Sequence, residues 1–236
     1  LQHKKFRDED GLFLAEGQKV VMDLLNRRKF ICKEIFELHN WIAEQGKALS
    51  TLRDTEINAV EDFELQKISS LSTAHDVVAV FEKRKPANDF KPDSKITLAL
   101  DTIQDPGNLG TIIRIADWFG IENIVCSIGC ADMYNGKVVQ STMGSLGRVN
   151  VIYTDLLTWL QENKAVKIYS ASLEGKDVKA FGILKEGILI IGNEANGVSG
   201  EVMELVNEQI NIPGVGEAES LNAAVATGII LSHITR

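Results

Sequence analysis

The 236-residue chain has little cysteine and no long apolar segment. No apolar run approaches the roughly 18–20 residues that cross a bilayer, and the first residues contain no apolar signal-peptide core, so we expect neither a membrane span nor a secretory signal. The three cysteines, Cys32, Cys126 and Cys130, are too few for a disulfide framework, and no second Cys or His pair completes a zinc site. We therefore expect reduced thiols, no metal and a cytoplasmic location.

Two common nucleotide-binding motifs are also missing. No G-x-G-x-x-G follows the first strand predicted for the second domain, and no G-x-x-x-x-G-K-[ST] occurs anywhere in the chain. Both classes of protein hold phosphates with these glycine-rich turns. The sequence therefore gives no support to a dinucleotide-binding or P-loop protein.

The chain lacks the excess of positive charge that is typical of a protein that binds a polyanion. It has 33 acidic and 25 basic side chains, and its net charge is −8. The imbalance is concentrated in residues 93–236, which hold 17 acidic and 10 basic side chains, whereas residues 1–92 hold 16 and 15. A polyanionic partner would therefore be expected to face the first part of the chain.

Residues 82–95 are a break in composition, because they contain two of the four prolines and few apolar residues. Predicted helices and strands alternate on both sides of this break, which is typical of α/β domains. We predict a small α/β domain over residues 1–88, a linker over 89–95, and an α/β domain with a parallel sheet over 96–236.

The end of the chain has the pattern of two strands that are each followed by a polar or glycine-rich loop. Residues 187–191 are an apolar run bounded by glycine, which predicts a buried strand, and residues 192–197 after it are polar. Residues 198–207 have helical spacing, and residues 209–213 predict a second strand that ends at a proline. Loops at the ends of parallel strands are where an open α/β sheet usually binds a ligand.

Two further helices flank this region in the predicted domain. Residues 220–231 are almost wholly apolar and predict a buried helix, with Ser220 as its N-cap. Upstream, residues 101–110 are rich in turn formers and predict a loop. Residues 111–119 then predict a helix that carries Arg114 near its start.

Three segments together resemble the motifs of a known family. They are DPGNLGTIIR at residues 105–114, IIGNEANGVS at 190–199 and INIPGVGEAESLNAAVA at 210–226. In this order and spacing they resemble the three motifs of the SpoU (TrmH-like) RNA ribose methyltransferases of the SPOUT superfamily. The resemblance covers residues 95–236. Residues 1–90 more loosely resemble the small substrate-binding domain, similar to ribosomal protein L30e, that precedes the catalytic domain in members acting on ribosomal RNA.

This resemblance implies both a fold and a reaction. It implies a C-terminal trefoil knot that begins near residue 187, a homodimer formed through the catalytic domain, and methyl transfer from S-adenosylmethionine to a ribose 2′-hydroxyl of RNA, with ribosomal RNA preferred. Gly192, Ile212 and Leu221 stand at positions that the family uses to bind the cofactor. Glycine allows a close approach of the backbone, and the two aliphatic side chains could sandwich an adenine.

Five polar residues stand where the family places the groups around the reacting atoms: Asn108, Arg114, Glu194, Ser220 and Asn222. Methyl transfer to a hydroxyl requires alignment of donor and acceptor and removal of a proton. The resemblance leaves two roles open for the arginine. It is either the general base or a cation that binds the target phosphate and stabilises the developing alkoxide, and the second role is favoured because a guanidinium normally stays protonated.

Alternative functions are compatible with the same motifs. One is 2′-O-methylation of transfer RNA, another is a non-catalytic RNA-binding protein that retains the fold, and a third is an enzyme that acts on a small molecule and uses the first domain only for assembly. The presence of all five polar residues counts against the non-catalytic protein.

Overall fold

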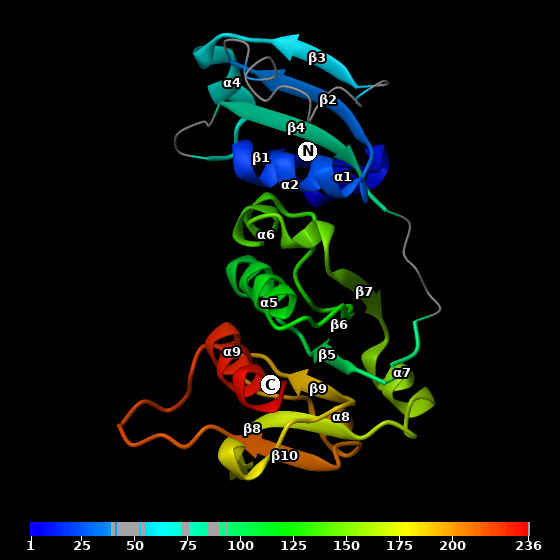
Figure 1. Ribbon diagram of the computed structural model, residues 1–236, viewed down its shortest axis with the longest axis vertical. Helices are drawn as coiled ribbons and strands as arrows, with labels where there is room; N and C mark the ends of the chain where they lie inside the picture. The colour runs from blue at the N-terminus through cyan, green and yellow to red at the C-terminus, as the bar shows by residue number, and fades with distance from the viewer. Residues whose placement is uncertain are drawn as a thin grey trace. The chain divides into compact units, whose positions relative to one another are not determined.

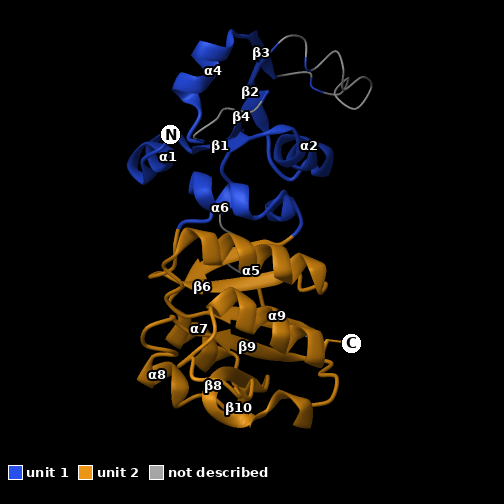
Figure 2. Cartoon of the chain, turned by 90° about the vertical axis from the view of Figure 1, so that its left-hand side faces the viewer, with its two compact units in different colours: residues 1–85, 132–148 blue, residues 86–131, 149–236 orange. Residues whose placement is uncertain are grey.

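The computed structural model describes residues 1–38, 41, 52, 55–71, 76–84, 90–92 and 94–235. The chain divides into two compact units, which Figure 2 shows in different colours. Unit 1 consists of Leu1–Lys85 and Asp132–Arg148, and unit 2 consists of Pro86–Ala131 and Val149–Arg236. Within the described ranges, no helix is long and apolar enough to cross a membrane. The predicted linker, 89–95, lies partly outside the described residues.

Unit 1 contains a four-stranded sheet in the order β1-β4-β2-β3 (Figure 1). β4 pairs antiparallel with both β1 and β2, and β3 pairs parallel with β2. The strands are β1 (Leu12–Glu16), β2 (Cys32–Glu37), β3 (Glu56–Ala59) and β4 (Val77–Glu82). The helical segments are α1 (Lys4–Asp10), α2 (Gln18–Arg27), α4 (Asp62–Ile68), α6 (Gly136–Ser141) and η2 (Ser145–Gly147).

The core of unit 1 includes side chains from residues 132–148, which follow β6 of unit 2 in the chain. Tyr134, Val139 and Leu146 are buried in the same cluster as the apolar face of α2. The ring of Tyr134 lies 4.8 Å from that of Phe13, measured between centroids. An ion pair of 2.7 Å also joins Asp132 to the buried Arg7. The segment therefore packs as part of unit 1.

The predicted second domain, 96–236, includes residues 132–148 because they are continuous with it in the chain. Helical spacing shows that the segment buries an apolar face, but it does not show which core receives that face. The partners lie far away in the sequence: Arg7 and Asp132 are 125 residues apart. Such long-range packing leaves no local signal.

Unit 2 contains a six-stranded sheet in the order β10-β8-β9-β5-β6-β7, and every strand pair is parallel. This confirms the predicted α/β fold with a parallel sheet. The strands are β5 (Ile96–Leu100), β6 (Asn123–Ser127), β7 (Asn150–Thr154), β8 (Ile168–Asp177), β9 (Gly187–Ile191) and β10 (Glu208–Asn211). The helical segments are α5 (Pro106–Trp118), α7 (Leu156–Glu162), η3 (Val178–Ala180), α8 (Gly200–Met203) and α9 (Ala223–Ile234).

The centre of this sheet is the pair of strands β5 and β9, in which every residue is buried. Side chains alternate between the two faces, so Ala99, Ile188 and Ile190 pack in one cluster with residues of α7 and α8. On the other face α5 and α9 pack against each other (Figure 1). Because the strands are parallel, the loops that follow β5, β9 and β10 lie at the same edge of the sheet.

Three helices differ from the prediction, and one of them is the helix predicted over 220–231, which is α9 (Ala223–Ile234). α5 begins at Pro106 and not at residue 111, because the carboxylate of Asp105 accepts a hydrogen bond from the N–H of Asn108 at 2.8 Å and proline is favourable at the first helical position. The helix predicted over 198–207 is reduced to Gly200–Met203, because the chain turns into β10 at Glu208.

We expect Leu146→Ala to lower the free energy of unfolding by about 2–5 kcal/mol, because it leaves a cavity in the core of unit 1. Urea denaturation followed by circular dichroism measures this loss. Ile183→Ala, which removes an exposed side chain, is the control and should change the value by less than about 0.5 kcal/mol. If both variants unfold like the unmodified protein, residues 132–148 do not stabilise unit 1.

Candidate functional site

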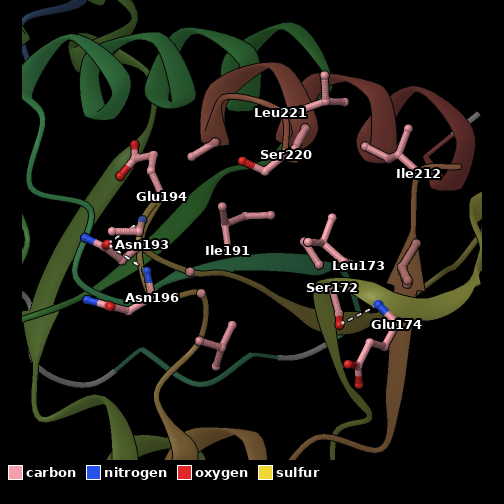
Figure 3. A pocket seen from close by; sticks show the side chains of 18 of the residues that line it. Ser172, Leu173, Glu174, Ile191, Asn193, Glu194, Asn196, Ile212, Ser220 and Leu221 are labelled. Atoms are coloured by element: carbon pink, nitrogen blue, oxygen red, sulfur yellow. Dashed lines mark hydrogen bonds between the residues drawn. The ribbon is translucent and has the colours of Figure 1, made fainter. Parts of the chain in front are cut away.

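A cavity of about 500 Å³ lies at the edge of the unit 2 sheet where the strands end. Its walls are formed by residues 171–174 of β8, residues 191–198 at the end of β9, residues 210–221 from β10 to the start of α9, and side chains of α8 and α9; Figure 3 shows part of this lining. Its size falls within the range of about 300–1,000 Å³ that is usual for ligand sites. The two C-terminal loops predicted to bind a ligand therefore line one cavity.

All three residues predicted to bind a cofactor line this cavity. Ile212 and Leu221 lie on the segment between β10 and α9 (Figure 3). Gly192 directly follows β9. Leu221 is 47% exposed, so it is not an ordinary core residue. Ile191 and Leu173 add further apolar surface to the lining.

Gly192 is also required by the loop to which it belongs. A Cβ atom at this position would lie 2.2 Å from the carbonyl carbon of Gly197 and 2.4 Å from the nitrogen of Val198. Any other residue would therefore collide with the backbone of its own loop. Gly192 was expected to let a ligand approach the backbone closely. In the structure it lets the backbone of residues 197 and 198 approach closely.

The cavity has a negative lining. Glu174, Glu194 and Glu219 contribute to it, and no lysine, arginine or histidine is among its described lining residues. Such a lining favours a ligand with positive charge and disfavours a polyphosphate. This agrees with the absence of phosphate-binding motifs from the sequence.

The three sequence motifs meet at the side chain of Asn108 on α5. Its Nδ2 donates a hydrogen bond to the carboxylate of Glu194, and its Oδ1 accepts one from Nδ2 of Asn222 at 2.8 Å. A carboxylate can only accept, so Glu194 fixes which end of the Asn108 amide faces it. One hydrogen-bonded chain, Asn222–Asn108–Glu194, thus joins all three motifs.

The N-cap of α9 is Asn222 and not Ser220, so this prediction was wrong. The Oδ1 of Asn222 accepts hydrogen bonds from the N–H groups of Ala224 at 3.0 Å and Val225 at 3.3 Å. Serine and asparagine are both good N-caps, and the sequence does not decide between two such residues that lie two positions apart. Ser220 instead lies in the loop before the helix and lines the cavity.

Arg114 is the one predicted site residue that the structure places apart from the others. Its side chain is exposed on α5, and it belongs neither to the cavity lining nor to the chain of hydrogen bonds. It follows Asn108 by six residues, which places the two side chains about 120° apart around the helix. Among the described residues the guanidinium has no hydrogen-bond or ion-pair partner.

Several residues that hold the loop after β9 do not stand out in the sequence. Asp101 and Thr102 follow β5, and both bond to the loop after β9. Behind them, Sγ of Cys130 accepts a hydrogen bond from the N–H of Ile103 at 3.3 Å. A hydrogen bond from Cys126 is the main reason why the pKa of Cys130 is lowered to about 7. The signal that could have found Asp101 is a carboxylate directly after a wholly apolar strand.

Comparison with known proteins shows the family. The profile described as "SpoU rRNA Methylase family" matches residues 95–232, more than half of the chain. The chain belongs to the SpoU rRNA methylase family. A second profile, "MRM3-like substrate binding domain", matches residues 1–79.

Two known proteins are similar to the chain over almost its whole length, and a third is similar to 60% of it. The 23S rRNA (guanosine(2553)-2'-O)-methyltransferase RlmP of Bacillus subtilis is 33% identical, and the alignment covers 99% of this chain and 92% of that protein. The crystal structure of an AdoMet-bound rRNA methyltransferase from Sinorhizobium meliloti is 32% identical with a TM-score of 0.87, over 98% of this chain and 89% of that one. A TrmH/SpoU tRNA modifying enzyme from A. aeolicus is 30% identical with a TM-score of 0.52, over 60% of this chain and 74% of that one.

We expect Asn222→Ala to lower the free energy of unfolding by about 1 kcal/mol, because it removes the N-cap of α9. Ser220→Ala is the matched variant and should change the value by less than about 0.5 kcal/mol, since Ser220 caps nothing. Thermal unfolding of the two ligand-free variants measures the difference. Equal losses, or a larger loss for Ser220→Ala, would contradict the assignment of the cap.

Proposed function

We propose that this chain is an S-adenosylmethionine-dependent methyltransferase that methylates a ribose 2′-hydroxyl of ribosomal RNA. The observation that carries the proposal is the hydrogen-bonded chain Asn222–Asn108–Glu194, which joins the three motifs beside a cavity with a negative lining. The names of the relatives support the reaction, and the AdoMet-bound structure from Sinorhizobium meliloti supports the cofactor.

The residues of the cavity fit S-adenosylmethionine. Ile212 and Leu221 offer apolar surface for an adenine, and the backbone that follows Gly192 offers polar groups to the rest of the molecule. When bound, the cofactor supplies a methyl group activated by a sulfonium. The carboxylates of the lining, Glu174, Glu194 and Glu219, suit the positive charges of that sulfonium and of the amino group.

The polar residues beside the cavity would orient the acceptor ribose. Glu194 and Asn222 hold the amide of Asn108 in one orientation, so these groups are in place before the substrate arrives. The hydroxyl of Ser220 lies on the cavity wall. A preorganised set of donors and acceptors aligns the 2′-hydroxyl without reorganising during the reaction.

Arg114 would meet the RNA from its exposed position on α5. As a protonated guanidinium it would bind the target phosphate in a bidentate manner and stabilise the developing alkoxide. The same position is compatible with the alternative role of general base, which requires the guanidinium to lose its proton. We favour the first role because a guanidinium in an exposed position stays protonated.

Ribosomal RNA is favoured over transfer RNA by the length of the similarity. The rRNA methyltransferase from Sinorhizobium meliloti matches 98% of this chain, whereas the tRNA modifying enzyme from A. aeolicus matches 60%. Unit 1 would hold the RNA, as a small domain similar to ribosomal protein L30e. It has 16 basic and 16 acidic side chains, against 9 and 17 in unit 2, so it repels a polyanion less.

We also propose that the C-terminal part of unit 2 forms a trefoil knot. β9 lies between β5 and β8 in the sheet although it follows both of them in the chain. The strand therefore enters the sheet between two strands that precede it. This order supports the knot that the family resemblance implies. A crystal structure would test the knot. If the chain could be pulled straight from its two ends without forming a knot, the proposal would be wrong.

We expect the purified protein to transfer a labelled methyl group from S-adenosylmethionine to a ribose of ribosomal RNA. Arg114→Ala should lower the turnover by about a hundredfold or more, because it removes a positioned cation from the transition state. Cofactor binding, measured by calorimetry, should stay nearly unchanged since Arg114 does not line the cavity. Mapping of ribose methylation on the RNA measures the product.

The control is Lys164→Ala, which removes another exposed cation of unit 2. Arg114→Lys tests the role of the arginine: partial activity supports electrostatic stabilisation, and no activity supports bidentate positioning or base chemistry. A protein that binds the cofactor but methylates no RNA would overturn the proposed function. Wild-type turnover by Arg114→Ala would overturn the role of this residue alone.

We further propose a homodimer formed through α5 and α9. These helices pack against each other, with Gly228 of α9 beside Ile115 of α5. On the same two helices, Trp118 is 76% exposed and Val225 is 49% exposed. Exposed large apolar side chains are common at protein interfaces.

We expect Val225→Asp to shift the protein from dimer to monomer, because it places a charge in the apolar interface. Sedimentation velocity of the ligand-free protein measures the state. Ile183→Asp, at an exposed apolar position outside both helices, is the matched control and should leave the dimer intact. A dimer that persists in Val225→Asp would place the interface elsewhere.

A further inference from the structure

One residue, Asn193, makes four hydrogen bonds within the loop after β9. Its backbone N–H donates to the carbonyl of Gly197, and its own carbonyl accepts from the N–H of Gly197, both at 2.9 Å. Its side-chain Oδ1 accepts from the N–H groups of Ala195 at 2.8 Å and Asn196 at 3.3 Å. Glu194 is the second residue of this turn, and in Figure 3 its side chain points away from that of Asn193.

The same loop is fastened at two points to the segment that follows β5. The Nδ2 of Asn193 donates to the carbonyl of Thr102 at 2.9 Å. The N–H of Ser199 donates to Oδ2 of Asp101 at 2.8 Å. Asp101 is only 6% exposed, so it forms this bond largely shielded from water. The two fastenings hold both ends of the turn that carries Glu194.

Thr102 adopts a backbone conformation that is unfavourable for its type. Its φ is 59°, in the left-handed region, where a β-branched residue is rare. Its N–H donates to Oγ of Ser127 at 2.9 Å, and its Oγ1 donates to Oδ1 of Asp101 at 3.0 Å. Such a conformation persists only where the surroundings enforce it, and it occurs most often at functional sites. In this conformation the carbonyl of Thr102 accepts the hydrogen bond from Asn193.

We propose that Asn193 is a positioning residue for the methyl transfer, and that it acts by fastening the loop after β9 to the carbonyl of Thr102 so that Glu194 reaches Asn108. This inference rests on the proposed function. Glu194 is exposed at the mouth of the cavity, and its carboxylate fixes the Asn108 amide. The contact of Glu194 with the Asn108 amide, which Asn222 holds from its other end, therefore depends on a bond made by the residue before Glu194.

The chemistry of the contact requires asparagine. The side chain must accept two N–H groups with one atom and donate to a carbonyl with the other, and only a carboxamide of this length does both. Aspartate keeps the accepting oxygen and the shape. It replaces the donor with a negative oxygen that faces the carbonyl oxygen of Thr102. Asn193→Asp therefore breaks the fastening while it preserves the turn.

The decisive experiment is a double-mutant cycle on turnover at saturating RNA and cofactor. We expect Asn193→Asp to lower kcat by about tenfold to a hundredfold, since misplacement of a catalytic group by about 1 Å can have an effect of that size. In a Glu194→Gln background the same substitution should lower kcat by less than about twofold, because the residue it acts through is already altered. A role in stability alone would lower kcat by the same factor in both backgrounds, and that result overturns the proposal.

Asn123→Asp is the matched control, because it makes the same chemical change in the same unit. Its Oδ1 accepts a hydrogen bond from Asn150 at 3.1 Å, and it lies at the start of β6, away from the cavity. It should leave kcat unchanged. A loss of kcat equal to that of Asn193→Asp would show that added charge is the cause and would overturn the proposal.

A second measurement tests the contact without any turnover. The side-chain amide signals of Asn108 in the NMR spectrum of the ligand-free protein should shift in Asn193→Asp and stay in place in Asn123→Asp. Unchanged Asn108 signals in Asn193→Asp would overturn the inference even if the protein methylates RNA. If the protein methylates no RNA, shifted signals would still support the fastening, and only the proposed function would fail.

Discussion

The parallel pairing of β5 with β9 is the constraint on which the site of this protein depends. The two strands come from distant parts of the chain, and the register joins Leu100 to Ile191 at the ends where both strands stop. The residues that follow them therefore emerge next to each other. Every residue of both strands is buried, so the pairing is stabilised by apolar burial on both faces of the sheet. The first and second motifs become neighbours as a direct consequence.

The third motif begins in β10, and its asparagine reaches the same place through a helix. Asn222 caps α9, and this helix packs against α5, which carries Asn108. One amide thus completes a helix with its oxygen and joins the first motif with its nitrogen. Because Asn222 makes both contacts, the stability of the C-terminal helix and the geometry of the site depend on the same residue.

The sequence was sufficient for the central strands, because runs such as residues 96–100 and 187–191 are wholly apolar and bounded by turn formers. Gly192, Ile212 and Leu221, which the family resemblance singled out, line one cavity, and their role in binding a cofactor stays a prediction. The sequence did not predict the N-cap of α9, because Ser220 and Asn222 are both favourable N-caps. Only the packing of α9 selects between them. The start of α5 was missed although Asp105 and Pro106 form a favourable helix start.

Long-range relations could not be read from the sequence. The six-residue spacing between Asn108 and Arg114 does not reveal that their side chains diverge, because that follows only when both lie on one helix. The fastening of Asn193 to Thr102 joins residues 91 positions apart. The sequence around Asn193 and around Thr102 contains no pattern that predicts this contact. Sequence motifs gave the membership of the site, and packing decided its geometry.

The passage of residues 132–148 into unit 1 has a consequence for how the protein forms during synthesis. The chain crosses between the two units three times, after residues 85, 131 and 148. The core of unit 1 lacks Tyr134, Val139 and Leu146 until well over half of the chain has left the ribosome. A vectorially synthesised first domain normally folds before the second is made. Here unit 1 cannot complete its core until residues 132–148 have been synthesised, and β5 and β6 of unit 2 emerge before that point.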